Sequence, residues 1–154
     1  MSPALLERLA DLPQVVGVKQ GDLSPVAIDD ISNRLSGRLR LFCASDLAFL
    51  GPMMCGFDGV SSTNSCAPPE LVLEIFQAVR AGDARHAITL HRSWYDYRCI
   101  ARRFGQPQTV KAAMRWRGWN GGTVRTPLRD LSEQQAHVLG EVMAMSIGIQ
   151  KEAS

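Results

Sequence analysis

The sequence has 154 residues, of which 45% are hydrophobic and 21% are charged, a balance typical of one soluble globular domain. Its 17 basic and 15 acidic residues are spread along the chain and give a net charge of +2, so we expect neither nucleic acid nor membrane as a partner. The start "MSPALLERLADLP" has no secretory-leader pattern, and no apolar run reaches about 18 residues. We therefore predict a cytoplasmic protein.

The cysteines and histidines do not form a recognisable metal-binding pattern. Cysteines 43, 55, 66 and 99 lie far apart with no C-x-x-C spacing, which favours reduced, mostly buried thiols. His86 and His91 are separated by five residues rather than four, and His137 is isolated. We expect no metal ion and no other cofactor.

Strand and helix patterns alternate in the first half of the chain. Short apolar runs at 15–19, 39–43 and 59–63 predict strands. Helices are predicted between and after them, at 24–37, 46–56 and 68–82; the first has Ser24 as its N-cap and Pro25 at its first position. This alternation indicates a parallel sheet with helical crossovers, the arrangement of the α/β class.

The second half contains only helical patterns. One long helix is predicted from Asp83 to about Phe104, a second over 107–117 and a third from Ser132, where "SEQQ" forms a capping box. A parallel sheet of three strands has two open edges, and natural proteins rarely leave such edges exposed. We therefore expect a homo-oligomer or a complementing chain.

Several segments in the same order resemble one known family. "LADLPQVVGVKQGD" and "LFCASDLAFLGPMMCGFDGVSSTNSCAP" are similar to three successive strand regions of the class I aldolases and lyases of the dihydrodipicolinate synthase and N-acetylneuraminate lyase type. "AVRAGDARHAITLH", "GQPQTVKAAM" and "GGTVRTPLRDLS" are similar to the C-terminal helical segments of that family. The resemblance covers nearly the whole chain, but it reaches only the C-terminal half of the family.

The resemblance implies a partial TIM barrel. Residues 1–82 would supply the last three units of a (β/α)₈ barrel, and residues 83–154 a C-terminal three-helix segment. The first five barrel strands have no counterpart. They include, in the family, a proton-relaying tyrosine and a Gly-Thr-Thr loop that binds the pyruvate carboxylate. Tyr95 and Tyr97 belong to the later helical region and cannot replace that tyrosine.

Lys19 matches the Schiff-base lysine of the family. In that role its amine would condense with the carbonyl of pyruvate or a related 2-oxo acid, and a low-dielectric setting would supply free amine near neutral pH. The alternative is a surface lysine at the end of a strand, which keeps its charge in water.

Polar residues follow the next two predicted strands. Asp46 matches an acidic position of the family that would accept a hydrogen bond from a substrate hydroxyl, and it can equally serve as a helix N-cap. Leu47 stands where neuraminate lyases carry a second acid, which argues against a sialic acid substrate. The resemblance makes substrate-binding candidates of Ala44, Ser45, Asp46, Ser61, Ser62 and Thr63, although Ala44 replaces a glycine and strand-end hydrogen bonding would also explain the hydroxyls.

The sequence thus predicts a lyase or aldolase that acts on pyruvate or a related 2-oxo acid and that needs an N-terminal half-barrel to complete its site. The alternative is a non-catalytic half-barrel, that is, an oligomerisation or interaction module. An imine at Lys19 would distinguish the enzyme from the module.

Overall fold

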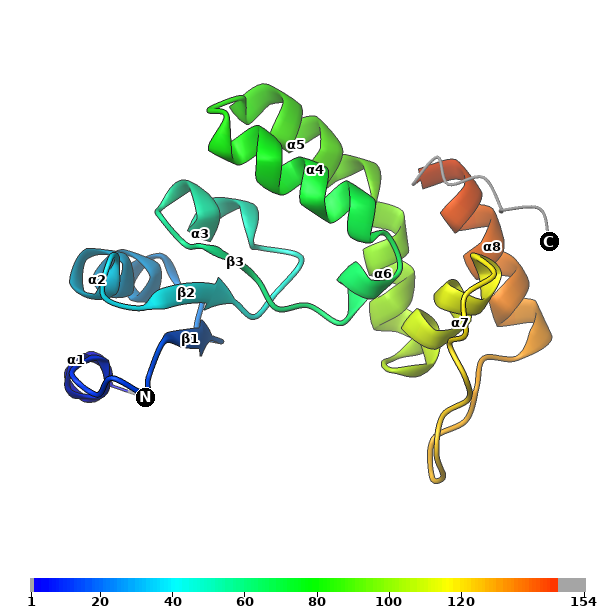
Figure 1. Cartoon of the computed structure of the whole chain (residues 1–154). Coiled ribbons are helices and arrows are strands. Elements are labelled where there is room, and N and C mark those ends of the chain that lie inside the picture. Colours follow the sequence, from blue (N-terminus) through cyan, green and yellow to red (C-terminus); the bar gives the residue numbers. More distant parts are fainter. Residues whose placement is uncertain (1, 147–154) are drawn as a thin grey trace. The chain divides into compact units, whose positions relative to one another are not determined.

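The computed structural model describes residues 2–146, which belong to two compact units, residues 1–62 and 63–154 (Figure 1). The boundary between the two compact units falls after Ser62. The sequence instead predicts a boundary after residue 82, between the barrel-like β/α units and the helical region. That division at 82 stays a prediction.

The first unit is a three-stranded parallel sheet with its helices (Figure 1). Its elements are α1 (Pro3–Ala10), β1 (Gly17–Gln20), α2 (Pro25–Leu35), β2 (Arg40–Cys43), α3 (Leu50–Met54) and β3 (Gly59–Val60). The strand order is β1-β2-β3, and Lys19 in β1 lies in register with Phe42 in β2, which lies in register with Gly59 in β3. The predicted parallel sheet is confirmed.

Local signals explain where the first helices begin. The side chain of Ser24 accepts a hydrogen bond from the N–H of Ala27 at 3.3 Å, and Pro25 is the first residue of α2, as predicted. Ser2 caps α1 in the same way, through the N–H of Leu5 at 3.4 Å. A hydroxyl cap followed by proline satisfies an unpaired N–H and presets the helical φ.

Two predicted elements of the first unit are too long. The helix expected over 46–56 is confined to α3, with Phe49 rather than Asp46 at its N-cap and a turn over residues 46–49. The hydroxyl of Ser45 accepts the N–H of Leu47 at 3.2 Å, a local bond that stabilises a turn instead of a helix. The strand expected over 59–63 contains only Gly59 and Val60.

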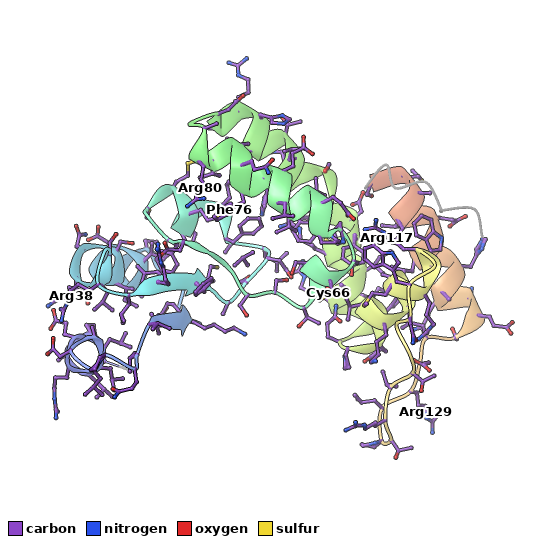
Figure 2. The ribbon with its side chains drawn as sticks, viewed as in Figure 1. Arg38, Cys66, Phe76, Arg80, Arg117 and Arg129 are labelled. Atoms are coloured by element: carbon purple, nitrogen blue, oxygen red, sulfur yellow. The ribbon has the colours of Figure 1, made fainter. Side chains whose placement is uncertain are left out.

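The second unit consists of helices. Its elements are the 3₁₀ turn η1 (Asn64–Cys66) and helices α4 (Pro69–Arg80), α5 (Ala84–Ser93), α6 (Tyr95–Phe104), α7 (Gln108–Trp116) and α8 (Glu133–Ser146). The capping box at α8 is confirmed, because the Ser132 hydroxyl accepts the N–H of Gln135 at 3.2 Å and the Gln135 side chain accepts the N–H of Ser132 at 3.0 Å. Arg80 lies over the ring of Phe76 on α4, with the guanidinium carbon 4.9 Å from the ring centre (Figure 2).

The long helix predicted from Asp83 to Phe104 is two helices, which meet at Trp94. The guanidinium of Arg98 donates a hydrogen bond to the carbonyl oxygen of His91 at 2.9 Å, and this carbonyl would otherwise accept the next helical N–H. The hydroxyl of Ser93 also donates to the carbonyl of Leu90 at 2.8 Å. These side-chain bonds compete with the helical ladder, and the fully buried Trp94 occupies the corner.

Buried apolar side chains form a core in each unit. In the first unit they include Leu6, Val18, Ile31, Leu35, Leu41, Cys43, Phe49 and Met53. In the second they include Ile75, Ala87, Trp94, Tyr97, Ala101, Val110, Ala113, Leu139 and Met143. The cysteines differ from the expectation, because only Cys43 is buried, whereas Cys55 and Cys66 are exposed and Cys99 is half-buried.

Candidate functional site

The two faces of the sheet are covered unequally. Along β2, Leu41 and Cys43 are fully buried, whereas Phe42 between them is 37% exposed. Lys19 pairs with Phe42 in the parallel register and therefore lies on the same face. Parallel sheets are normally covered on both faces. The face that carries Lys19 and Phe42 is thus the open side of this unit.

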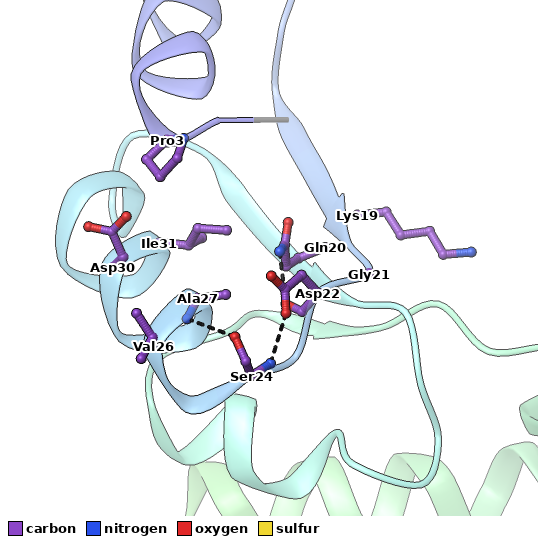
Figure 3. Close-up of a pocket in the computed structure, with 10 residues that line it drawn as sticks. All are labelled: Pro3, Lys19, Gln20, Gly21, Asp22, Ser24, Val26, Ala27, Asp30 and Ile31. Atoms are coloured by element: carbon purple, nitrogen blue, oxygen red, sulfur yellow. Dashed lines mark hydrogen bonds between the residues drawn. The ribbon is translucent and has the colours of Figure 1, made fainter.

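Lys19 is exposed, in contrast to the low-dielectric setting expected for it. Lys19 lines a hollow of about 520 Å³ together with Pro3, Gln20, Asp22, Ile31 and other residues of α2 and of the segment before it. Figure 3 shows the side chain of Lys19 pointing away from Pro3 and Ile31. The amine therefore extends from the open face of the sheet, although Lys19 also contributes to the lining of the hollow.

The residues around Lys19 explain how its strand begins and ends. A Cβ atom on Gly17 would lie 2.8 Å from the carbonyl oxygen of Arg40, so only glycine allows β1 and β2 to approach this closely. After the strand, the side chain of Gln20 donates to the carbonyl of Asp22 at 2.8 Å. The carboxylate of Asp22 accepts the N–H of Ser24 at 3.0 Å, and this bond lowers the pKa of Asp22. A short connection stabilised by local side-chain hydrogen bonds thus joins β1 to α2.

The carboxyl ends of the three strands are connected by backbone hydrogen bonds beyond the strands themselves. The N–H of Ala44 donates to the carbonyl of Gln20 at 3.0 Å, and the N–H of Ser61 donates to the carbonyl of Cys43 at 2.8 Å. These bonds bring Ala44 next to the end of β1 and Ser61 next to the end of β2. We call Ala44, Ser45, Asp46, Ser61 and Ser62 the strand-end row.

Asp46 and Ser62 are joined directly. The hydroxyl of Ser62 donates a hydrogen bond to the Oδ2 atom of Asp46, a residue that is only 8% exposed. A buried carboxylate that accepts a hydroxyl proton is held in one orientation. Sequence reasoning selected both residues but did not predict this bond; the signal was an acid and a hydroxyl at the ends of adjacent strands.

The other predicted residues have different surroundings. The hydroxyl of Ser45 accepts a hydrogen bond from the N–H of Leu47. The thiol of Cys43 donates to the carbonyl of Ser45 at 3.2 Å. Burial raises the pKa of the Cys43 thiol. Thr63 is exposed and is the first residue of the second unit. Asn64, also in the second unit, is buried and its side-chain oxygen accepts a hydrogen bond from the amide of Gln106.

Within residues 2–146, no group of three His, Cys, Asp or Glu side chains is arranged to hold a metal ion. In the same part of the chain, no helix is both long and apolar enough to cross a membrane.

Curated relatives are about twice as long as this chain. One is the 4-hydroxy-tetrahydrodipicolinate synthase of Symbiobacterium thermophilum, 34% identical over 146 residues that cover 94% of this chain and 49% of the relative. A probable 5-dehydro-4-deoxyglucarate dehydratase of Chelativorans sp. is 31% identical over 146 residues, with 90% and 48% covered. The chain thus spans about half the length of these relatives.

Solved structures support the interpretation as part of a barrel. The chloride-inhibited dihydrodipicolinate synthase of Acinetobacter baumannii complexed with pyruvate matches with a TM-score of 0.84 and 26% identity, covering 97% of this chain and 51% of that one. The N-acetylneuraminate lyase of Fusobacterium nucleatum matches with a TM-score of 0.86 and 18% identity, over 96% and 50%, which indicates a shared fold.

The family model described as the dihydrodipicolinate synthetase family matches residues 1–145, which is almost the whole described chain. The match includes Lys19 and the strand-end row. This chain therefore belongs to the dihydrodipicolinate synthetase family.

Proposed function

We propose that this chain supplies the lysine-bearing half of a Schiff-base lyase or aldolase that acts on pyruvate or a related 2-oxo acid. The observation that carries the proposal is the position of Lys19, exposed on the open face of a parallel sheet next to the strand-end row. In α/β barrels, catalytic groups stand at the carboxyl ends of the strands. A relative of the same family that was solved with pyruvate supports the substrate class.

In the proposed reaction, the free amine of Lys19 attacks the carbonyl carbon of the 2-oxo acid. The resulting carbinolamine loses water, and the iminium ion that forms withdraws electrons from the neighbouring carbon. Loss of a proton or cleavage of a bond at that carbon then leaves an enamine. Asp46, held by Ser62, accepts a hydrogen bond from a hydroxyl of the substrate, because a carboxylate has more than one acceptor site.

Further β/α units are needed to complete such a site. The open face that carries Lys19 leaves its amine exposed to water. Covering that face would exclude water from the reacting groups. We propose that these units lie on the same polypeptide or on a complementing chain, and that they supply proton transfer and carboxylate binding.

Reductive trapping tests the lysine directly. The protein is incubated with pyruvate and borohydride, its intact mass is measured, and any adduct is located by peptide digestion. We expect one reduced imine per chain at Lys19 and none in the Lys19→Arg variant. Lys111, which is half-buried, serves as an internal control in the digest. An adduct spread over Lys111 and Lys19 alike, in a protein shown to be folded, would contradict a special role for Lys19.

A second candidate function is a non-catalytic module that assembles with itself. The exposure of Phe42 on the open face and the unpaired outer edges of β1 and β3 among the described residues favour this alternative. Light scattering over a range of concentrations, combined with the trapping experiment, distinguishes the two. A stable oligomer with no imine supports the module, whereas trapping at Lys19 supports the enzyme.

A further inference from the structure

The loop between α7 and α8 is ordered by contacts at its base. Lys111 donates from Nζ to the carbonyl of Gly121 at 2.8 Å, and Arg115 donates to the carbonyl of Gly122. Arg115 also forms an ion pair with Asp130 at 3.7 Å, on the returning limb of the loop. In Figure 1 this loop, coloured yellow to orange, projects from the helices of its unit as a narrow finger. Two cationic side chains of α7 thus hold both the beginning and the end of the loop in place.

The outer part of the loop and the start of α7 border an open hollow. This hollow has a volume of about 500 Å³, within the range of small-molecule sites in proteins. Its apolar wall is formed by Pro107, Val124, Pro127 and Leu128. Leu128 is 44% exposed. A ligand that covers its side chain would remove apolar surface from water, which is favourable.

The charged side chains that line the hollow are all basic. Lys111 and Arg125 contribute positive charge, and Thr123 and Thr126 contribute hydroxyls, whereas none of its lining residues is acidic. Among the described residues, Arg125 has no ion-pair partner, and the ammonium of Lys111 uses one of its three N–H donors for Gly121. The hollow beside α2, by contrast, contains Asp22 and Asp30.

We propose that this hollow binds a small aliphatic carboxylate. The hydrocarbon part of the ligand packs against Pro127 and Leu128, and its carboxylate accepts hydrogen bonds from Arg125 and Lys111. Each buried methylene group strengthens binding, so a chain of several carbons binds more tightly than acetate. The site belongs to the second unit, whereas Lys19 belongs to the first, and the proposal does not depend on the Schiff-base chemistry.

Hexanoate is a suitable probe because it lacks the 2-oxo group and so cannot form an imine with Lys19. Titration of the ¹⁵N-labelled protein with sodium hexanoate at constant ionic strength is expected to shift the amide signals of residues 107–128 in a saturable way. The dissociation constant is expected to be on the order of 1 mM, the range for a ligand of this size in an open site. Acetate and hexylammonium, which lack the hydrocarbon chain and the negative charge respectively, are expected to bind at least about tenfold more weakly.

Variants of the loop separate the proposed contacts from general surface charge. Arg125→Gln removes the charged donor and is expected to weaken hexanoate binding about fivefold. Leu128→Asn removes the apolar contact and is expected to weaken it by a similar factor. Arg129→Gln is the matched control, because Arg129 is on the outer part of the same loop (Figure 2) but does not line the hollow.

The proposal is wrong if hexanoate shifts no signals, if the shifted signals lie outside residues 107–128, or if hexylammonium binds as well as hexanoate. It is also wrong if Arg129→Gln weakens binding as much as Arg125→Gln. The dispersion of each variant's spectrum shows whether it is folded, and Leu128→Asn gives an independent measurement if Arg125→Gln is not.

Discussion

Ser62, at the end of β3, donates its hydroxyl proton to the carboxylate of Asp46, which follows β2. The two residues are 16 positions apart in the chain, and their bond joins the carboxyl ends of neighbouring strands. This bond orients the Asp46 carboxylate at the end of β2. The substrate-binding role expected for Ser62 stays a prediction.

We expect Ser62→Ala to destabilise the first unit by about 1–3 kcal/mol, because a buried carboxylate loses a donor. Ser61→Ala is the matched control, since Ser61 is the exposed neighbour and its backbone N–H, which bonds to the carbonyl of Cys43, is retained in alanine. Urea unfolding followed by circular dichroism measures both. Equal free energies of unfolding for the two variants would show that the Ser62–Asp46 bond contributes nothing.

Arg117 holds the beginning of α4 through a bidentate ion pair. Its two terminal nitrogens donate to the carboxylate oxygens of Glu70 at 2.7 and 3.0 Å, and one of them also donates to the carbonyl of Ala67 at 2.6 Å. The guanidinium carbon lies 3.9 Å from the ring centre of Trp119. The hydrogen bonds from Arg117 lower the pKa of Glu70, and partial burial opposes this shift.

The lowered pKa of Glu70 predicts a pH dependence of stability. A carboxyl group whose pKa is lower in the folded state stabilises the fold above its unfolded-state pKa, and this contribution is lost as the pH falls through the folded-state pKa. We expect it to be below about 1 kcal/mol, because the side chain of Glu70 is 62% exposed. Free energies of unfolding between neutral and acidic pH should therefore fall less steeply for Glu70→Gln than for the unaltered protein. Glu133→Gln, at an exposed residue in the first turn of α8, is the control; an identical change in the pH dependence there would contradict the prediction.

Local patterns made much of the fold predictable. The cap at Ser24, the capping box at Ser132 and the strand that carries Lys19 depend on residues within a few positions of one another. The break at Trp94 was not predictable, because it depends on the side chain of Arg98 reaching the carbonyl of His91. For the same reason the Ser62–Asp46 bond could not be predicted, since it requires the strand register.

Gly140 allows close packing of α8 against α7. A Cβ atom at this position would lie 2.9 Å from Nε1 of Trp116 and 3.1 Å from its Cδ1. We expect Gly140→Ala to destabilise the protein by about 1–3 kcal/mol through overpacking, although alanine favours helices more than glycine does. Gly51→Ala in α3 is the control, because a Cβ there would contact nothing within 4 Å and should be neutral or stabilising. If Gly140→Ala unfolds at as high a temperature as Gly51→Ala, the Trp116 ring can move aside without loss of stability.

Gly17 connects the packing of the sheet to the presentation of Lys19. A Cβ atom on Gly17 would lie 2.8 Å from the Arg40 carbonyl oxygen, and a backbone atom in a paired strand cannot move aside as a side chain can. Gly17→Ala should therefore push β1 away from β2 and destabilise the first unit by about 1–3 kcal/mol. Since Lys19 depends on β1 for its position, pyruvate trapping should decrease together with stability.

Gly21→Ala provides the comparison for this last experiment, because Gly21 lies just after the same strand and a Cβ there would meet nothing within 4 Å. Amide hydrogen exchange at Val18 and Gln20 reports on the pairing of β1, and borohydride trapping reports on Lys19. Faster exchange and weaker trapping in Gly17→Ala, with both unchanged in Gly21→Ala, would connect the reactivity of the lysine to the geometry of the sheet. Normal exchange in Gly17→Ala would instead show that β1 and β2 can separate slightly without losing their hydrogen bonds.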